Sequence, residues 1–184
     1  MKTGKLRFFL GVCSFLFGIF TLAAQTEGQG AEISDTYRRI RLGMDIEAVK
    51  KQLLADGIFG YRGDRDVSLL PAPNKALIET AGASFIERSW FQFHDGNLYI
   101  MTFKLNPERI DYYSVFSALL EKYGEPAILN PLKAVWNDER VTLSLERPLT
   151  VKYVDAQMFG ELMEASGTEQ AASDMLREMF ISEF

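Results

Sequence analysis

Cysteine and histidine are nearly missing from this 184-residue chain, which contains one of each. A disulfide needs two thiols, and protein zinc sites usually combine several His, Cys or carboxylate ligands. Cys13 lies in an apolar stretch near the N-terminus, and His94 lies beside the turn pair Asp95-Gly96. The sequence therefore excludes an internal disulfide, and we expect no metal site and no cofactor.

Recognisable catalytic motifs are missing as well. The chain has no Gly-x-Ser-x-Gly elbow, no Ser-x-x-Lys pair and no phosphate-binding glycine loop. Glycosidases use paired acids, and the pairs Asp64/Asp66 and Asp138/Glu139 have that composition, but a chain with 25 acidic residues contains such pairs by chance. We expect a protein that is not an enzyme, and a hydrolase with two converging carboxylates stays open as an alternative.

A secretory signal peptide is predicted over residues 1–24. Residues 2–7 contain three bases, residues 8–22 are mostly apolar, and Ala23-Ala24 provide the small residues of a cleavage site. The apolar run is shorter than the roughly 20 residues that a membrane-spanning helix needs. We expect a bacterial protein that is periplasmic or secreted after cleavage, with no membrane span in the mature chain.

Cys13 allows a second interpretation of the same segment. Leu10 to Cys13 has a faint likeness to a lipoprotein processing site, where the cysteine is lipidated and becomes the first residue. Val12 is bulkier than the residue usual at its position, and mostly apolar residues follow the cysteine. Cleavage after Ala24, without a lipid anchor, is the favoured prediction.

The mature chain is acidic, with 17 bases and 25 acids and thus a net charge of −8 after cleavage. Such a surface repels nucleic-acid phosphates, so we expect no nucleic-acid partner. The remaining 160 residues suit one domain. We predict a flexible polar segment at 25–36, an α+β domain at 37–155, and a C-terminal helical segment at 156–184.

Two helices are predicted inside the domain. Asp45 can cap a helix whose apolar face contains Ile46, Val49, Leu53 and Leu54 and which stops at Gly57. A broader apolar stripe predicts a second helix, ended by Gly124 and Pro126; its members are Tyr112, Val115, Phe116, Leu119, Leu120 and Tyr123.

Strand-like segments follow each helix, and Asp95-Gly96 predicts the tight turn of a hairpin over 87–105. The other segments are 67–70, 76–80, 134–137, 141–146 and 150–154. A helix followed by a meander thus occurs twice. This pattern predicts an α+β fold with an antiparallel meander sheet and helices on one face; two helix-plus-meander repeats sharing that sheet and two unrelated halves are both compatible with it.

The C-terminal segment is predicted to form two short helices. Met158, Phe159, Leu162 and Met163 form one apolar face, and a second contains Met175 and Met179. Residues 166–169 between them resemble a capping box.

Both faces of the predicted hairpin are apolar. With a two-residue turn, Phe91, Phe93, Leu98 and Ile100 share one face. Trp90, Tyr99, Met101 and Phe103 fall on the other. A three-residue loop with a bulge would shift the register by one and reassign members, but it would still leave a tryptophan or several aromatics opposite the main core. Either the C-terminal helices or the second repeat cover that face as ordinary core, or it is a docking surface that a C-terminal helix could cover reversibly. We take Trp90, Tyr99, Met101, Phe103, Met175 and Met179 as the candidate interaction surface.

A literal Arg62-Gly63-Asp64 tripeptide lies in the loop after the first helix and has the letters of the integrin-recognition motif. A charged glycine-rich loop that joins a helix to a strand explains the same residues, and we favour that explanation.

The helix opening LGMDIEAVKKQL, followed by a meander containing WFQFHDGNLYIMTFKL, resembles two groups of small exported α+β domains. They are the BamE (SmpA/OmlA) outer-membrane assembly lipoproteins and the beta-lactamase-inhibitor-like group. The resemblance covers residues 40–155 and implies protein binding; it assigns no individual residue a role.

The sequence as a whole predicts an exported, non-enzymatic cell-envelope protein. Its partner would be another envelope protein or a peptide, bound through the aromatic sheet face or a C-terminal helix. A carrier of a lipid or small ligand, with an apolar pocket between sheet and helices, is the alternative.

Overall fold

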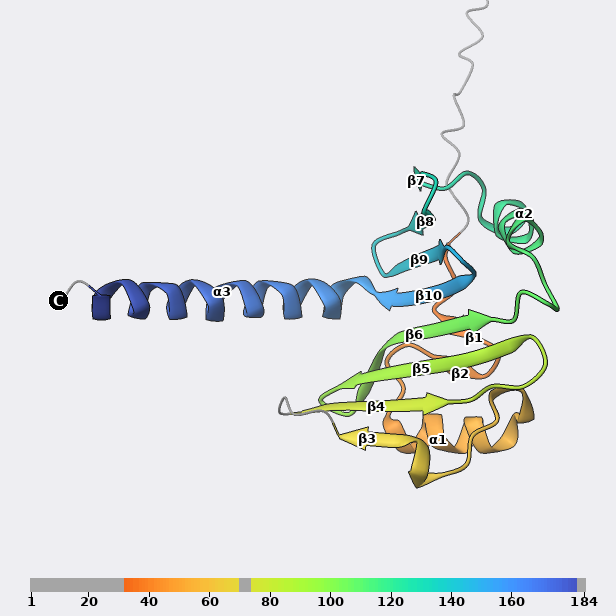
Figure 1. Cartoon of the computed structure of the whole chain (residues 1–184), viewed down its shortest axis with the longest axis horizontal. Coiled ribbons are helices and arrows are strands. Elements are labelled where there is room, and N and C mark those ends of the chain that lie inside the picture. The colour runs from red at the N-terminus through yellow and green to blue at the C-terminus, as the bar shows by residue number, and fades with distance from the viewer. Residues whose placement is uncertain (1–31, 70–73, 182–184) are drawn as a thin grey trace, which may run out of the picture.

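The computed structural model describes residues 32–69 and 74–181, and the predicted signal peptide with Cys13 lies outside this range (Figure 1). The helices are α1 (Ile46–Ala55), α2 (Tyr112–Tyr123) and α3 (Ala156–Ile181), and two 3₁₀ turns span Gly57–Phe59 and Asp64–Asp66. The strands are β1 (Thr36–Tyr37), β2 (Ile40–Arg41), β3 (Val67–Leu69), β4 (Lys75–Thr80), β5 (Ile86–His94), β6 (Asn97–Leu105), β7 (Ile128–Leu129), β8 (Lys133–Asn137), β9 (Val141–Glu146) and β10 (Thr150–Asp155).

The main sheet joins two four-strand meanders. Its strand order is β3-β4-β5-β6-β10-β9-β8-β7, and all neighbouring strands are antiparallel. The first meander follows α1 and the second follows α2, and the last strand of each, β6 and β10, pair at the centre. The α+β fold class and the sharing of one sheet by two helix-plus-meander units are therefore confirmed.

Two helix ends are set by the residues that the sequence predicts, whereas α1 ends at Ala55, before the predicted stop at Gly57, which begins a 3₁₀ turn. The Asp45 carboxylate accepts a hydrogen bond from the backbone N–H of Ala48 and caps α1, and Asp111 caps α2 in the same way. Gly124, at φ +78°, ends α2. The prediction that Leu54 belongs to the buried face of α1 is wrong. Leu54 is 66% exposed, and the buried residues of α1 are Val49 and Leu53.

The β5–β6 hairpin contains a bulge that the tight turn does not reveal. Asp95 and Gly96 have positive φ values and form the predicted turn. Gln92 pairs with Ile100 but Phe93 pairs with Leu98, which leaves Tyr99 as an extra residue in β6. One extra residue moves every later side chain of the strand to the opposite face.

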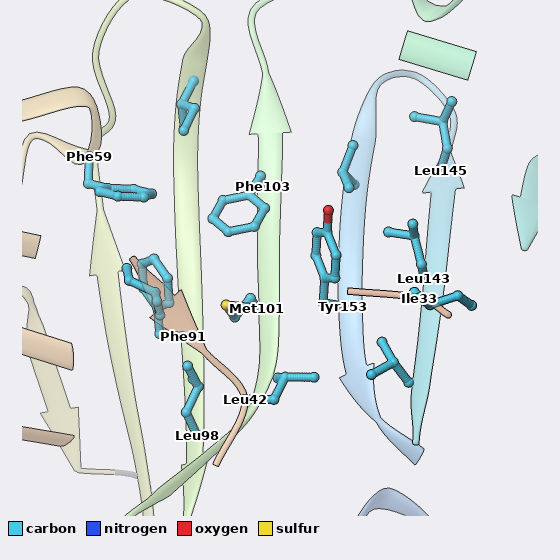
Figure 2. Close-up of a cluster of buried hydrophobic side chains, with 14 of the residues drawn as sticks. Ile33, Leu42, Phe59, Phe91, Leu98, Met101, Phe103, Leu143, Leu145 and Tyr153 are labelled. Carbon is cyan, nitrogen blue, oxygen red and sulfur yellow. The ribbon is translucent and has the colours of Figure 1, made fainter. Parts of the chain in front are cut away.

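The predicted face of Met101 and Phe103 is therefore wrong. Met101 lies opposite Phe91, and Phe103 lies opposite Ser89, so both point into the core. They are 0% and 1% exposed. Figure 2 shows Phe103 between Phe91 and Tyr153, and ring centroids at 5.9 and 6.3 Å confirm this aromatic packing.

The core covers one face of the sheet. Val49 and Leu53 of α1, Tyr37 of β1 and Tyr123 of α2 all belong to or pack against the same cluster. The fold begins earlier than predicted, because Ile33 is 6% exposed and its backbone N–H donates to Asp138 at 2.8 Å. Both helices that precede the meanders lie on this face, as predicted.

The C-terminal segment is one helix, α3, and the prediction of two short helices is wrong. Gly167 lies inside α3, and the Thr168 hydroxyl donates to the Glu164 carbonyl as in a helix interior. Figure 1 shows α3 leaving the end of β10 and running away from the sheet. Among the described residues, no helix combines the length and apolar character that a bilayer crossing requires.

Candidate interaction surfaces

The six residues of the predicted interaction surface do not form one surface. Met101 and Phe103 belong to the core, as described above. Trp90 is half-buried on the opposite side of the sheet, and the bulged Tyr99 is 9% exposed. Met175 and Met179 lie on α3 and are 65% and 59% exposed. The structure thus leaves two separate candidates, a sheet face and a helix.

The first candidate is the side of the sheet opposite α1 and α2, which we call the open face. Strand alternation places Trp90, Thr102 and Lys152 in one row across its centre, and Ile100 beside Val154 in the next. Ile100 is 5% exposed, whereas Trp90, Lys152 and Val154 keep partial exposure. The open face is therefore a mixed surface of apolar and polar side chains.

The open face is positively charged, although residues 32–155 as a whole hold 16 bases and 18 acids. Its charged side chains are five bases and three acids: Lys75, Arg88, Lys104, Lys133, Lys152, Glu79, Glu87 and Glu146. Arg88 pairs with Glu79 at 2.8 Å, and Lys104 pairs with Glu87 at 2.7 Å. Lys152 forms no ion pair within residues 32–69 and 74–181, so the centre of the face holds an uncompensated charge.

The second candidate is α3, which combines exposed apolar side chains with a strong negative charge. Met163 is 58% exposed, Met175 is 65% exposed and Ile181 is 58% exposed. The 26-residue helix holds five acids and one base, a net charge of −4. Single exposed apolar residues are ordinary, but several on one projecting helix indicate a contact surface.

A third apolar surface lies beside β7, a strand that the sequence did not predict. Tyr113, Leu129 and Leu132 are 76%, 61% and 73% exposed near the start of α2. Beside them a cavity of 480 Å³ is lined partly by Phe116 and Arg147. The short apolar run at residues 127–129, between two prolines, was the available signal.

Among the described residues, the sequence-predicted candidates for catalysis lie apart from one another. His94 lies on β5 at the hairpin turn, and its Nε2 atom is 3.4 Å from a carboxylate oxygen of the adjacent Asp95. Asp64 is 94% exposed at its side chain, whereas Asp66 is buried. Within the described part of the chain, no three His, Cys, Asp or Glu side chains gather so that they could hold a metal ion.

The Arg62-Gly63-Asp64 loop is organised by an internal ion pair. The Arg62 guanidinium lies 2.7 Å from the buried Asp66 carboxylate, which also accepts the Arg62 backbone N–H at 2.8 Å. Gly63 has a φ of +86°, and a Cβ there would meet nothing but would be strained. These contacts explain the residues of the loop through local structure.

Asp138 has a structural role. Its carboxylate accepts backbone N–H groups from Val141, Arg140 and Ile33, at 2.7 to 2.8 Å. Burial raises the pKa of Asp138, but these hydrogen bonds outweigh it and hold the pKa below its usual range. Asp138 therefore joins the N-terminal segment to the β8–β9 turn, whereas the neighbouring Glu139 is exposed.

The fold and these surfaces define an α+β domain in which two helix-plus-meander units share one antiparallel sheet and a single helix extends from its centre. The family model of the TP0088 domain matches residues 35–165, and the chain belongs to that family. The match covers the whole sheet and the start of α3. No curated protein and no solved structure matches the chain.

Proposed function

We propose that this protein is an exported, non-enzymatic component of the cell envelope that binds another protein, and that α3 is its binding element. The single observation behind the proposal is the projection of α3, with Met163, Met175 and Ile181 each more than half exposed. The implied protein binding of the BamE-like resemblance agrees with it. Residues 1–24 support the exported location.

The energetics of α3 favour a partner. Most helical stability in proteins comes from packing of an apolar face, and isolated helices are marginal in water. Gly160 and Gly167 each cost about 1 kcal/mol relative to alanine within a helix. Burial of a methionine or isoleucine side chain gains about 1.5–3 kcal/mol. Contact with a partner would therefore stabilise both the helix and the complex.

The charge of α3 restricts the class of partner. Interfacial membrane helices are rich in Lys and Arg, whereas α3 has one base and five acids. Anionic lipid headgroups would repel it. A protein surface with apolar contacts and basic side chains is the complementary partner.

The alternative of a lipid or ligand carrier has less support. Such a carrier needs an apolar pocket between sheet and helices, but in the described residues Phe59, Phe91 and Phe103 fill that space. Their ring centroids lie 5.7 to 6.2 Å apart.

Site-specific photo-crosslinking in the living cell tests the proposal. A photoreactive residue in place of Met163 should yield a defined product with another protein chain, whereas the same residue in place of Leu54 should not. Leu54 is the matched control, because it is equally apolar and 66% exposed but lies on α1. Products absent at Met163, or equal at both positions, would contradict α3 as the binding element.

A further inference from the structure

We infer that the partner of α3 is a second copy of this chain, and that α3 of one copy docks on the open face of the other. This inference rests on the proposed function and names its partner. It joins the open face and α3, the two candidate surfaces described above.

The junction between β10 and α3 prevents α3 from covering the sheet to which it is attached. Asp155 is the last residue of β10, and its carboxylate caps α3 by accepting the Met158 N–H at 2.9 Å. The backbone N–H of Ala156 donates to the Arg140 carbonyl, which holds the start of α3 beside the first residue of β9. A helix that folds back on its sheet needs a connecting loop, and here there is none.

Charge complementarity identifies the receiving surface. The open face has an excess of two positive charges, and α3 has an excess of four negative charges. Lys152 lies at the centre of the face, next to Thr102 and in the same row as Trp90, and it forms no ion pair within the described ranges. Acidic side chains of a docked α3 would compensate it, while Trp90 and Val154 would meet the helix's apolar side chains.

The same charges argue against a direct pairing of two α3 helices. Each helix has a net charge of −4, so a parallel or antiparallel pair would bring like charges together. An exchange of α3 between two copies buries each helix on a positive face. It also closes with twofold symmetry, so that the same contact forms twice per dimer.

The dimensions of the two surfaces match. A helix of 26 residues is about 39 Å long. Eight strands spaced by about 4.8 Å span about 34 Å from the first to the last. The open face is therefore large enough to receive most of α3.

Sedimentation velocity of the purified protein over a wide concentration range tests this inference. The expected result is a dimer whose dissociation constant rises with ionic strength. Lys152→Glu should raise that constant at least about tenfold, because it places like charges at the contact. Lys51→Glu is the matched control, with the same charge change on the exposed surface of α1, and should leave the constant within about twofold.

Three results would overturn the inference: a monomer at every concentration, an equal response to the two substitutions, or a dimer that needs α3 but tolerates Lys152→Glu. Circular dichroism would establish that both variants are folded. A monomer whose α3 still crosslinks to a different protein at Met163 would overturn the second copy as partner and leave the proposed function standing. Absence of both the dimer and the crosslink would overturn both proposals.

Discussion

The Asp155 carboxylate accepts a hydrogen bond from the backbone N–H of Met158 at 2.9 Å, so that the last residue of β10 is also the N-cap of α3. Strand and helix are thereby joined without a loop. The central strand pair of the sheet, β6–β10, therefore holds the base of the helix that projects from the domain. This cap and the hydrogen bond from the Ala156 N–H to the Arg140 carbonyl both hold the start of α3 at the sheet.

Asp155→Ala should loosen the start of α3 and leave the domain intact. Loss of an N-cap costs about 1 kcal/mol. Because α3 makes few contacts with the sheet, this destabilisation should stay within α3. Hydrogen exchange at residues 157–160 should become faster, while exchange in β5 and β6 stays unchanged. Asp45→Ala is the control, because α1 packs in the core and its cap should affect global stability. An equal loss of protection in β5 after Asp155→Ala would contradict this account.

Met101→Ala should destabilise the protein more than Trp90→Ala. Met101 is fully buried, and truncation of such a residue costs about 2–5 kcal/mol. Trp90 is half-buried on the open face, so its replacement removes less packing. The free energies of unfolding from urea titrations would measure the difference. A larger loss of unfolding free energy for Trp90→Ala than for Met101→Ala would contradict the placement of the main core on the side of the sheet that Met101 faces.

Asp138→Asn should lower stability in a pH-dependent way. The asparagine amide nitrogen cannot accept N–H groups, so the loss at neutral pH should be about 1–3 kcal/mol. Because the folded-state pKa lies below the unfolded value of about 3.9, the carboxylate stabilises the fold above that pH. This stabilisation is lost as pH falls through the folded pKa.

Urea titrations of the Asp138→Asn protein and the unaltered protein at a series of pH values would measure this effect. The difference in unfolding free energy should be constant near neutrality and shrink below about pH 4. Glu139→Gln is the control, since Glu139 is the exposed neighbour. A difference that grows on acidification would contradict the role of the Asp138 carboxylate.

Local signals in the sequence predicted most of the fold. Asp45 and Gly124 mark helix ends because caps satisfy free backbone groups nearby. Asp95-Gly96 adopts the positive φ values that a tight turn requires. The repeated helix-plus-meander pattern then indicated a shared sheet, although not the pairing of β6 with β10.

The candidate site was harder to predict, because it depends on the register of β6 and on the direction in which α3 leaves the sheet. The bulge at Tyr99 places Met101 and Phe103 in the core, and no residue at the turn indicates that β6 contains a bulge. Residues 166–169 have the letters of a capping box but lie inside α3. Strands of two residues, such as β7, are too short to show an alternating pattern.

The most direct test of the account is a linker insertion at the junction. A flexible Gly-Ser linker of about six residues between Asp155 and Ala156 would let α3 reach the open face of its own chain. The dimer should become a monomer, and the α3 amides should be protected from hydrogen exchange in that monomer. A dimer that persists unchanged, or a monomer whose α3 exchanges freely, would contradict docking of α3 on the open face.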